Sequence, residues 1–315
     1  MSPTTLVRGR LAEHPLWARA LAQPALAPRS IRPVIVSARV EDRERVPDAP
    51  WLERLSLTEL VRDARAAASK GLAGFLVFGM SDRKDEQAML ASERDHVVTR
   101  AIHAVKDAAP DLAVATDVCV CAYTTHGQCV LFTEGNADVV GTLGRLSEIA
   151  LVHADAGADL LVASGMLDGT VRALRVALAG SAHASVPVAS VVALESQLYA
   201  THSRAVESVP VRERAVPLAE PVDPDAVRSR ALRDISDGAD AIVLRPGLLA
   251  LDHVVRVSAV ADRPVAAHFT ADEHALYQAE SLADGAAAEQ ETLLAARRAG
   301  ADLVISHAAV DAAEA

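Results

Sequence analysis

All three cysteines of this 315-residue chain lie in one short run, as Cys119, Cys121 and Cys129. Sulfur is a preferred zinc ligand, and three protein ligands leave a fourth position for water or substrate. Because Cys119 and Cys121 are two apart at the end of an apolar run, they share a face if the backbone stays extended. Cys129 returns from the next loop, where Gly127 eases the turn. We expect a zinc ion that polarises a carbonyl or activates water; three thiols packed as small hydrophobic groups are the alternative.

Two other polar side chains accompany the cysteines. Asp117 precedes the run and His126 lies within it. Either side chain could orient a metal ligand from the second coordination shell or replace one. Either could instead cap the loop, and the sequence leaves these possibilities open.

Composition limits the kinds of partner that the chain can have. A net charge of −11 argues against nucleic acid and anionic membranes. No apolar run approaches the roughly 20 residues that a membrane span needs, and residues 1–30 lack a signal-peptide core. An odd number of cysteines without a secretory signal indicates a reducing compartment and metal chemistry. We therefore expect a cytoplasmic protein that acts on a small molecule.

Apolar runs of strand length alternate with helical patterns along the chain. The predicted strands span 33–40, 73–79, 112–120, 158–164, 186–193, 239–244, 264–269 and 301–307, and the predicted helices include 57–69, 93–109, 145–156, 223–236 and 283–299. The runs are continuous rather than alternating, which suits parallel strands buried on both faces. Eight βα units predict an α/β fold, the (β/α)8 TIM barrel. An open doubly wound sheet is disfavoured because no glycine-rich nucleotide loop follows the first strand.

The barrel is expected over residues 31–315. Residues 1–30 are predicted to form an N-terminal extension arm for oligomerisation, with a transit peptide as the alternative. The segment at about 194–222 is too long for a routine connection, so we interpret it as an active-site lid. Working residues of such barrels come from the C-terminal ends of the strands. The residues at or near these ends are Cys119, Cys121, Ser164, Leu194, Arg245, His268 and His307.

The cysteine run DVCVCAYTTHGQC resembles the metal loop of the porphobilinogen synthase (5-aminolevulinate dehydratase) family in its zinc-dependent form. Other phrases match in the same order over nearly the whole chain, namely LVFGMSDRKDE, VASGMLDG, IVLRPGLLALD and RRAGADLVISHAA. The resemblance implies a (β/α)8 barrel whose arm embraces a partner in a homo-oligomer, from dimer to octamer. It also implies the condensation of two 5-aminolevulinate molecules into a pyrrole, with two Schiff-base lysines and the metal.

The two lysines that this resemblance implies are missing. Where the family has a lysine after the fifth strand, SVVALESQLYATHSR has Leu194, and VLRPG has Arg245 in place of the second lysine. The chain contains only Lys70, Lys84 and Lys106. A Schiff base needs a neutral amine, whereas arginine stays protonated and leucine has no nucleophile. We therefore expect no imine chemistry of the family type.

Further departures fall on the same strand ends. SGMLDGT retains Ser164 but loses a carboxylate at Gly165. HFTADEHAL has His268 in place of a tyrosine and Ala271 in place of a carboxylate-binding serine, and the last strand has His307 in place of a tyrosine. Together these changes alter the substrate pocket and leave the metal loop intact. They favour a changed substrate.

We expect the candidate residues to divide into three groups. The metal ligands are Cys119, Cys121 and Cys129, with His126 and Asp117 beside them. The catalytic candidates are His268, His307, Ser164 and Asp117, since histidine moves protons near neutral pH; ordinary packing is the alternative for both histidines. The substrate-binding candidates are Arg204, Arg245, Arg212, Arg214 and Leu194. Arg204 and Arg245 could hold a carboxylate, or Arg245 could pair with Asp168 or Glu195.

The leading interpretation is a zinc enzyme similar to porphobilinogen synthase that does not make porphobilinogen. It would carry out lyase, dehydratase or condensation chemistry on a small carboxylate-bearing amino or keto acid, in specialised biosynthesis. The first alternative is a true porphobilinogen synthase that works by an unusual route. The second is a non-catalytic zinc-binding paralogue.

Overall fold

Eight parallel strands close into a barrel in this computed structural model, which describes residues 9–47, 49–278 and 283–309. In order around the ring the strands are β1 (Ser30–Ser37), β4 (Gly74–Met80), β5 (Ala113–Val118), β8 (Leu160–Ala163), β9 (Val188–Ala193), β10 (Ala241–Arg245), β11 (Val265–His268) and β12 (Leu303–Ile305). The last strand pairs in parallel with the first, Ser30 with Val304 and Ile31 with Ile305. This closure confirms the predicted TIM barrel and excludes an open sheet. Each strand lies within or overlaps its predicted run.

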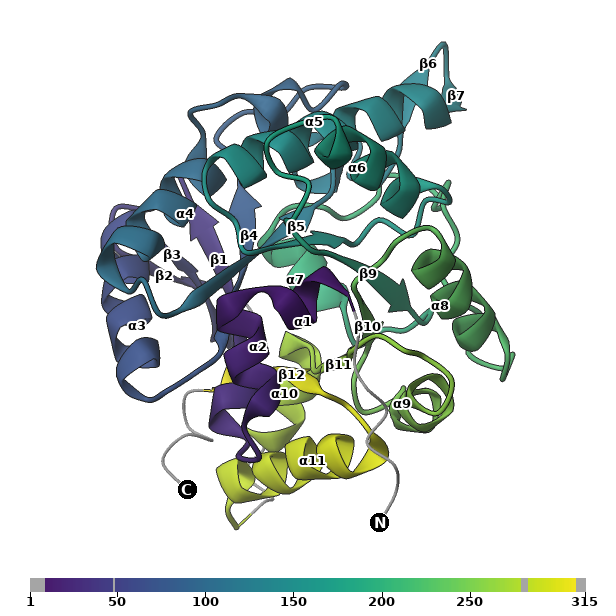
Figure 1. Cartoon of the computed structure of the whole chain (residues 1–315). Helices are drawn as coiled ribbons and strands as arrows, with labels where there is room; N and C mark the ends of the chain where they lie inside the picture. The colour runs from purple at the N-terminus through teal and green to yellow at the C-terminus, as the bar shows by residue number, and fades with distance from the viewer. Residues whose placement is uncertain (1–8, 48, 279–282, 310–315) are drawn as a thin grey trace.

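Helices surround the ring on its outer face (Figure 1). They are α3 (Leu57–Ser69), α4 (Val97–Ala108), α5 (Val139–Asp155), α6 (Thr170–Ala179), α8 (Ala226–Ser236), α9 (Leu251–Ser258), α10 (Ala271–Tyr277) and α11 (Gly285–Ala299). Because helices cover the outside and side chains fill the inside, strands such as β4 are buried at every position. Ser56 caps the N-terminus of α3, since its hydroxyl accepts a hydrogen bond from the Glu59 N–H. None of the helices within the described residues is long and apolar enough to cross a membrane.

The N-terminal segment lies across one end of this chain's own barrel, the end that faces the viewer in Figure 1. It forms α1 (Arg10–Glu13), α2 (Pro15–Ala22) and the short 3-10 helix η1 (Ala27–Arg29). The Trp17 side chain is 0% exposed, and its Nε1 donates to the Asp159 carbonyl at 2.9 Å. The described part of the predicted arm therefore caps the N-terminal ends of the strands. Residues 1–8 lie outside the described residues, and a role of the arm in oligomerisation stays a prediction.

Two hairpins were not predicted. One consists of β2 (Arg43–Val46) and β3 (Ala49–Leu55), and β3 also pairs in parallel with the end of β1. Arg43 holds this hairpin against α3 through ion pairs with Glu53, Glu59 and Asp63. The other consists of β6 (Leu131–Thr133) and β7 (Asn136–Asp138). Two 3-10 turns, η2 (Met89–Ser92) and η3 (Cys121–Tyr123), and one short helix, α7 (Ala200–Ala205), complete the described elements.

Two buried histidines pack against each other outside β5. His96 and His153 stack with ring centroids 5.6 Å apart, and the His153 Nδ1 lies 3.0 Å from the Thr116 hydroxyl. The Nε2 atoms of both rings are buried and have no partner among the described residues. Burial lowers the pKa of His96 to about 4 and the pKa of His153 to about 3. Both rings are therefore neutral in the folded protein.

This pair predicts a loss of stability in mild acid. Below pH 6.5 the unfolded chain gains protons that the folded chain cannot take up until about pH 4. The free energy of unfolding should therefore fall with decreasing pH in this window, by roughly 1.4 kcal/mol per pH unit for each fully neutral histidine. Urea unfolding of a His153→Gln variant between pH 7 and 5 should show a shallower fall. The exposed His103 supplies a control, because His103→Gln should leave the slope unchanged; equal slopes in all three proteins would contradict the assignment.

Candidate metal centre and active-site pocket

The three cysteine sulfurs converge at the C-terminal end of β5. The three Sγ atoms all lie within 4.8 Å of one another, and those of Cys119 and Cys121 are 3.3 Å apart. The expected route to this arrangement was wrong, because β5 ends at Val118 and Val120 has helical backbone angles. The two sulfurs meet across this tight turn, not along one face of a strand. The predicted cluster itself is present.

The chemistry of the cluster fits a soft metal ion. Hydrogen bonds from the Cys119 and Cys129 thiols hold the pKa of Cys121 well below its usual range, and the Ser208 hydroxyl acts in the same direction. A thiolate is the form of cysteine that binds metals. A Cβ atom added at Gly165 would lie 3.3 Å from the Cys129 Cβ and 3.6 Å from the Cys119 Sγ. The backbone at this position therefore packs closely against the cysteines, where a side chain would touch two of them.

A cavity of about 290 Å³ lies beside the sulfurs at this end of the barrel. The predicted residues that line it are Cys119, Cys121, Cys129, Asp117, Ser164, Leu194, Arg204, Arg214 and Arg245. The Ser164 hydroxyl donates a hydrogen bond to Asp117 Oδ1. Burial, and then the negative charge at Cys121, raise the pKa of Asp117 to about 7. One cavity thus combines a cysteine cluster, a carboxyl–hydroxyl pair and three arginines.

Arg245 is the buried cation of this cavity. Arg245 is the last residue of β10 and is 7% exposed. Its guanidinium carbon lies 3.6 Å from the centre of the Tyr199 ring. The described residues place no carboxylate within ion-pair distance of it. The alternative pairing with Asp168 is not present, because Asp168 binds Arg230 at 2.6 Å. The charge of Asp117 lies near enough to interact with Arg245. Since a buried charge without a direct ion-pair partner is costly, this guanidinium is suited to an anionic ligand.

Four predicted residues are not among those that line the cavity. His268 is 2% exposed in the barrel interior, where burial and then Arg245 keep its pKa well below the usual value. His307 borders a separate cavity and lies 6.1 Å from His274, ring to ring. Arg212 lies over the Phe132 ring, and the His126 Nδ1 accepts a hydrogen bond from the Gln128 N–H at 3.1 Å. Roles of these four in catalysis, substrate binding or metal support stay predictions.

Sequence reasoning missed two aromatic residues of the wall. Tyr199 and His202 line the cavity and stack with ring centroids 4.7 Å apart. Phe78 contacts the other side of His202 at 4.3 Å, and burial lowers the pKa of His202 to about 3. His202 lies on α7, inside the segment interpreted as an active-site lid. Tyr199 and His202 are three residues apart, a spacing that brings side chains together on a helix. This spacing was the signal in the sequence that could have identified them.

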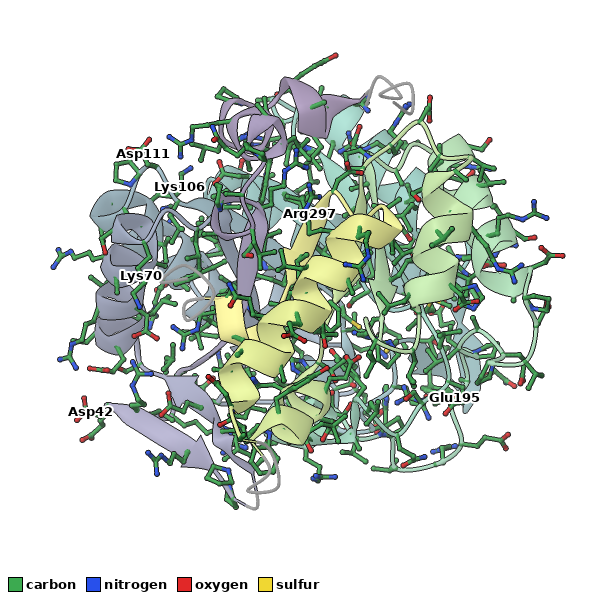
Figure 2. All side chains as sticks on the ribbon, turned by 90° about the horizontal axis from the view of Figure 1, so that it is seen from below. Asp42, Lys70, Lys106, Asp111, Glu195 and Arg297 are labelled. Atoms are coloured by element: carbon green, nitrogen blue, oxygen red, sulfur yellow. The ribbon has the colours of Figure 1, made fainter. Side chains whose placement is uncertain are left out.

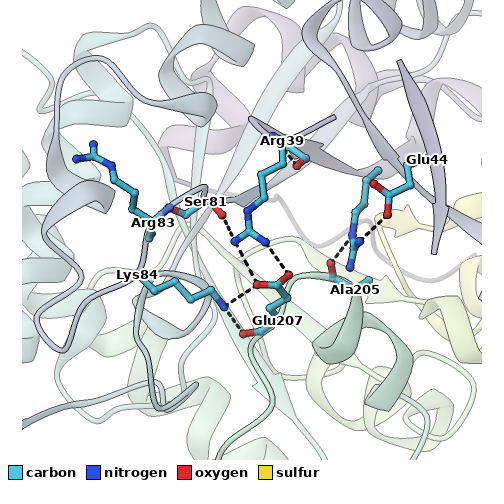
Figure 3. Close-up of polar contacts among 9 residues, drawn as sticks. Arg39, Glu44, Ser81, Arg83, Lys84, Ala205 and Glu207 are labelled. Atoms are coloured by element: carbon cyan, nitrogen blue, oxygen red, sulfur yellow. Dashed lines mark hydrogen bonds and ion pairs between the residues drawn. The ribbon is translucent and has the colours of Figure 1, made fainter. Parts of the chain in front are cut away.

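None of the three lysines lines this cavity. Lys84 Nζ donates to the Glu207 carbonyl and lies 3.5 Å from the Glu207 carboxylate. Arg39 binds the same carboxylate at 2.8 Å, so the three residues form one cluster at the rim (Figure 3). Lys106 pairs with Asp159 at 2.8 Å, and Figure 2 shows Lys70 and Lys106 far from Glu195, which lines the cavity.

The segment at 194–222 forms much of the cavity wall. Its lining residues include Leu194, Tyr199, Arg204, Val209 and Arg214. The backbone of Leu194 also continues the barrel, since its N–H donates to the Arg245 carbonyl at 2.9 Å. Movement of this segment as a lid stays a prediction.

Comparisons with known proteins agree with this arrangement. The sequence model of the delta-aminolevulinic acid dehydratase family matches residues 7–315. The enzyme of that name from Methanothermobacter thermautotrophicus is 35% identical over 317 residues, which cover 98% of this chain and 96% of the relative. The enzyme from Escherichia coli is 30% identical over 289 residues, 90% of this chain and 89% of the relative. A crystal structure of the enzyme from Toxoplasma gondii with its product porphobilinogen superposes with a TM-score of 0.88 at 28% identity, covering 98% and 90% of the two chains. This chain therefore belongs to the delta-aminolevulinic acid dehydratase family.

Proposed function

We propose that this protein is a metal-dependent enzyme that acts on a small carboxylate-bearing amino or keto acid without forming an imine. The absence of lysine from the cavity wall carries this proposal. Leu194 and Arg245 occupy the strand ends where the family resemblance implies the two Schiff-base lysines. Neither side chain can supply the neutral amine that a Schiff base needs.

Zinc is the metal proposed for the cysteine cluster. Cys119, Cys121 and Cys129 would hold it with three sulfurs, the donor set that zinc favours. Bound there, zinc would supply Lewis-acid chemistry to a substrate carbonyl or to water. Asp117 would orient the groups around it.

The chain's own residues would bind the substrate and move its protons. Arg245 would take a carboxylate at the inner end of the cavity, while the Tyr199 ring holds the guanidinium in place. Arg204 and Arg214, both exposed, would attract the anion at the mouth. The hydrogen-bonded Asp117 and Ser164 are the best-placed proton carriers because both line the cavity. Lyase, dehydratase or condensation chemistry fits this set.

A second candidate is the synthesis of porphobilinogen from 5-aminolevulinate by an unusual route. The comparisons favour it, because the matching family and the curated relatives carry the name delta-aminolevulinic acid dehydratase. The content of the cavity wall favours the first candidate. The two candidates differ in whether 5-aminolevulinate is converted to porphobilinogen.

An assay for porphobilinogen, which the first candidate does not form, separates the two candidates, and chemical trapping tests whether an imine forms at all. Zinc-loaded protein treated with 5-aminolevulinate and borohydride should show no mass increase, because no lysine lies in the cavity wall. Intact-mass measurement checks this, with a family member that retains both lysines as the positive control. A borohydride-dependent adduct, mapped by peptide digestion to a lysine of this chain, would overturn the first candidate.

Metal content tests the cysteine site. Purified protein should contain about one zinc ion per chain, and Cys121→Ala should lose most of it, since a three-sulfur site loses a ligand. Elemental analysis by mass spectrometry measures both. Ser69→Ala, on the exterior of α3, should keep its zinc as a control. Zinc retained by the cysteine variant would show that the metal is bound elsewhere.

Arg245 should determine the affinity for carboxylates. Arg245→Met should weaken binding of 5-aminolevulinate by roughly tenfold or more, because a hydrogen bond to a charged group contributes about 1.5–3 kcal/mol. Calorimetry with zinc-loaded protein measures the affinity. Arg233→Met removes an arginine of α8 outside the cavity lining and should bind as the wild type does. Equal affinities in all three proteins would contradict the role of Arg245.

A further inference from the structure

Part of the cavity wall, residues 207–215, lies directly on the metal loop. The Val211 N–H donates to the His126 carbonyl at 3.1 Å. Gly127 has a φ of +66°, and a Cβ atom added there would lie only 2.3 Å from the Val209 carbonyl oxygen. The backbones of the two segments therefore touch where glycine has no side chain.

Gln128 fastens these two segments together. This residue precedes Cys129 and is 2% exposed. Its Nε2 donates to the carbonyls of Arg212 and Glu213 at 3.3 and 2.8 Å, and its Oε1 accepts from the Ala215 N–H at 3.1 Å. One buried amide therefore binds backbone groups on both sides of residue 214.

Arg214 is the residue that this amide brackets. It lines the cavity, and its positive charge acts to lower the pKa of Cys129. Its neighbour Arg212 points elsewhere, with its guanidinium carbon 5.7 Å from the centre of the Phe132 ring. The backbone geometry around residue 214 therefore determines that Arg214, and not Arg212, lines the cavity.

The far end of this wall is fixed separately. Glu207 receives two hydrogen bonds from Arg39, at 2.8 and 3.2 Å, and lies beside Lys84 (Figure 3). That cluster ties the wall to the loops after β1 and β4. Gln128 ties it to the cysteine loop.

We propose that Gln128 is a positioning residue that couples the metal centre to the anion-binding role of Arg214. A metal ion that fixes Cys129 also fixes the neighbouring Gln128, which then holds the backbone around Arg214. Because such coupling is reciprocal, an anion held by Arg214 should strengthen metal binding. The identity of the anion as a substrate carboxylate rests on the proposed function.

Hydrogen exchange tests the coupling without any substrate. Zinc added to metal-free protein should slow exchange of the Val211 and Ala215 amides by about tenfold or more in the wild type. The effect should disappear in Gln128→Leu, which offers no hydrogen bonds. Gln128→Glu has nearly the same shape and still accepts from the Ala215 N–H, but it cannot donate to the two carbonyls, so it should keep at most part of the slowing at Ala215 and lose it at Val211. Exchange that is unchanged by zinc in the wild type, or equally slowed in both variants, would overturn the proposal.

A double-mutant cycle shows whether Gln128 acts through Arg214. With zinc-loaded protein and 5-aminolevulinate as the probe, Gln128→Leu and Arg214→Gln should each weaken binding by about tenfold. The double variant should bind no more weakly than Arg214→Gln. Independent, multiplying losses would show that Gln128 supports the fold generally and would overturn the assignment. Glu213→Gln, an exposed change in the same stretch, should bind as the wild type does.

Two further measurements distinguish a positioning role of Gln128 from damage to the metal centre and from failure of the proposed substrate class. The sulfur-to-metal absorption of the Cd²⁺-loaded protein should be the same in Gln128→Leu and the wild type, because no described hydrogen bond joins the Gln128 amide to the sulfurs. A changed spectrum would show damage to the metal centre and count against a positioning role. If wild-type protein does not bind 5-aminolevulinate, the proposed substrate class fails for this compound. The exchange measurement then still decides for or against Gln128.

Discussion

The candidate site depends on the closure of the barrel between β12 and β1. Their parallel pairing turns a series of βα units into a ring. Because all strands of the ring point the same way, their C-terminal ends form one rim. Cys119 after β5, Leu194 after β9 and Arg245 at the end of β10 therefore line a single cavity, although long stretches of chain separate them. The N-terminal segment occupies the opposite end, with Trp17 buried there.

Burial made the strands predictable from the sequence. The turns between the strands determine the other features, and these were harder to predict. Continuous aliphatic runs indicate strands covered on both faces, so the barrel followed from the sequence. The β2–β3 hairpin could not be predicted in this way, because it has no alternating apolar face. Ion pairs between Arg43 and its acidic partners hold the hairpin instead. The positions of His268 and His307 at strand ends were also predictable. Which way each side chain points was not, since one residue of register moves a side chain between cavity and packed interior.

Leu194 and Arg245, at the strand ends where the family resemblance implies lysines, affect the electrostatics of the cavity as well as its supply of nucleophiles. A lysine can lose its proton when buried, whereas an arginine keeps its charge. The cavity therefore contains a permanent cation, and the Tyr199 ring at 3.6 Å offsets part of the cost of burying it. An anionic ligand would offset more. The arginine therefore favours a carboxylate at the position where the family resemblance implies a covalent bond to the substrate.

The cysteine loop has two physical roles, and this affects how its survival is interpreted. Gly127 and Gln128 connect the loop to the cavity wall through backbone contact and a buried amide. Loss of the loop would therefore disturb the wall as well as remove the sulfurs. Intact cysteines alone do not separate a catalytic metal from a supporting one. The position of the three cysteines in the cavity lining is more informative, because wall support needs no opening toward the cavity, whereas a metal that binds substrate or water does.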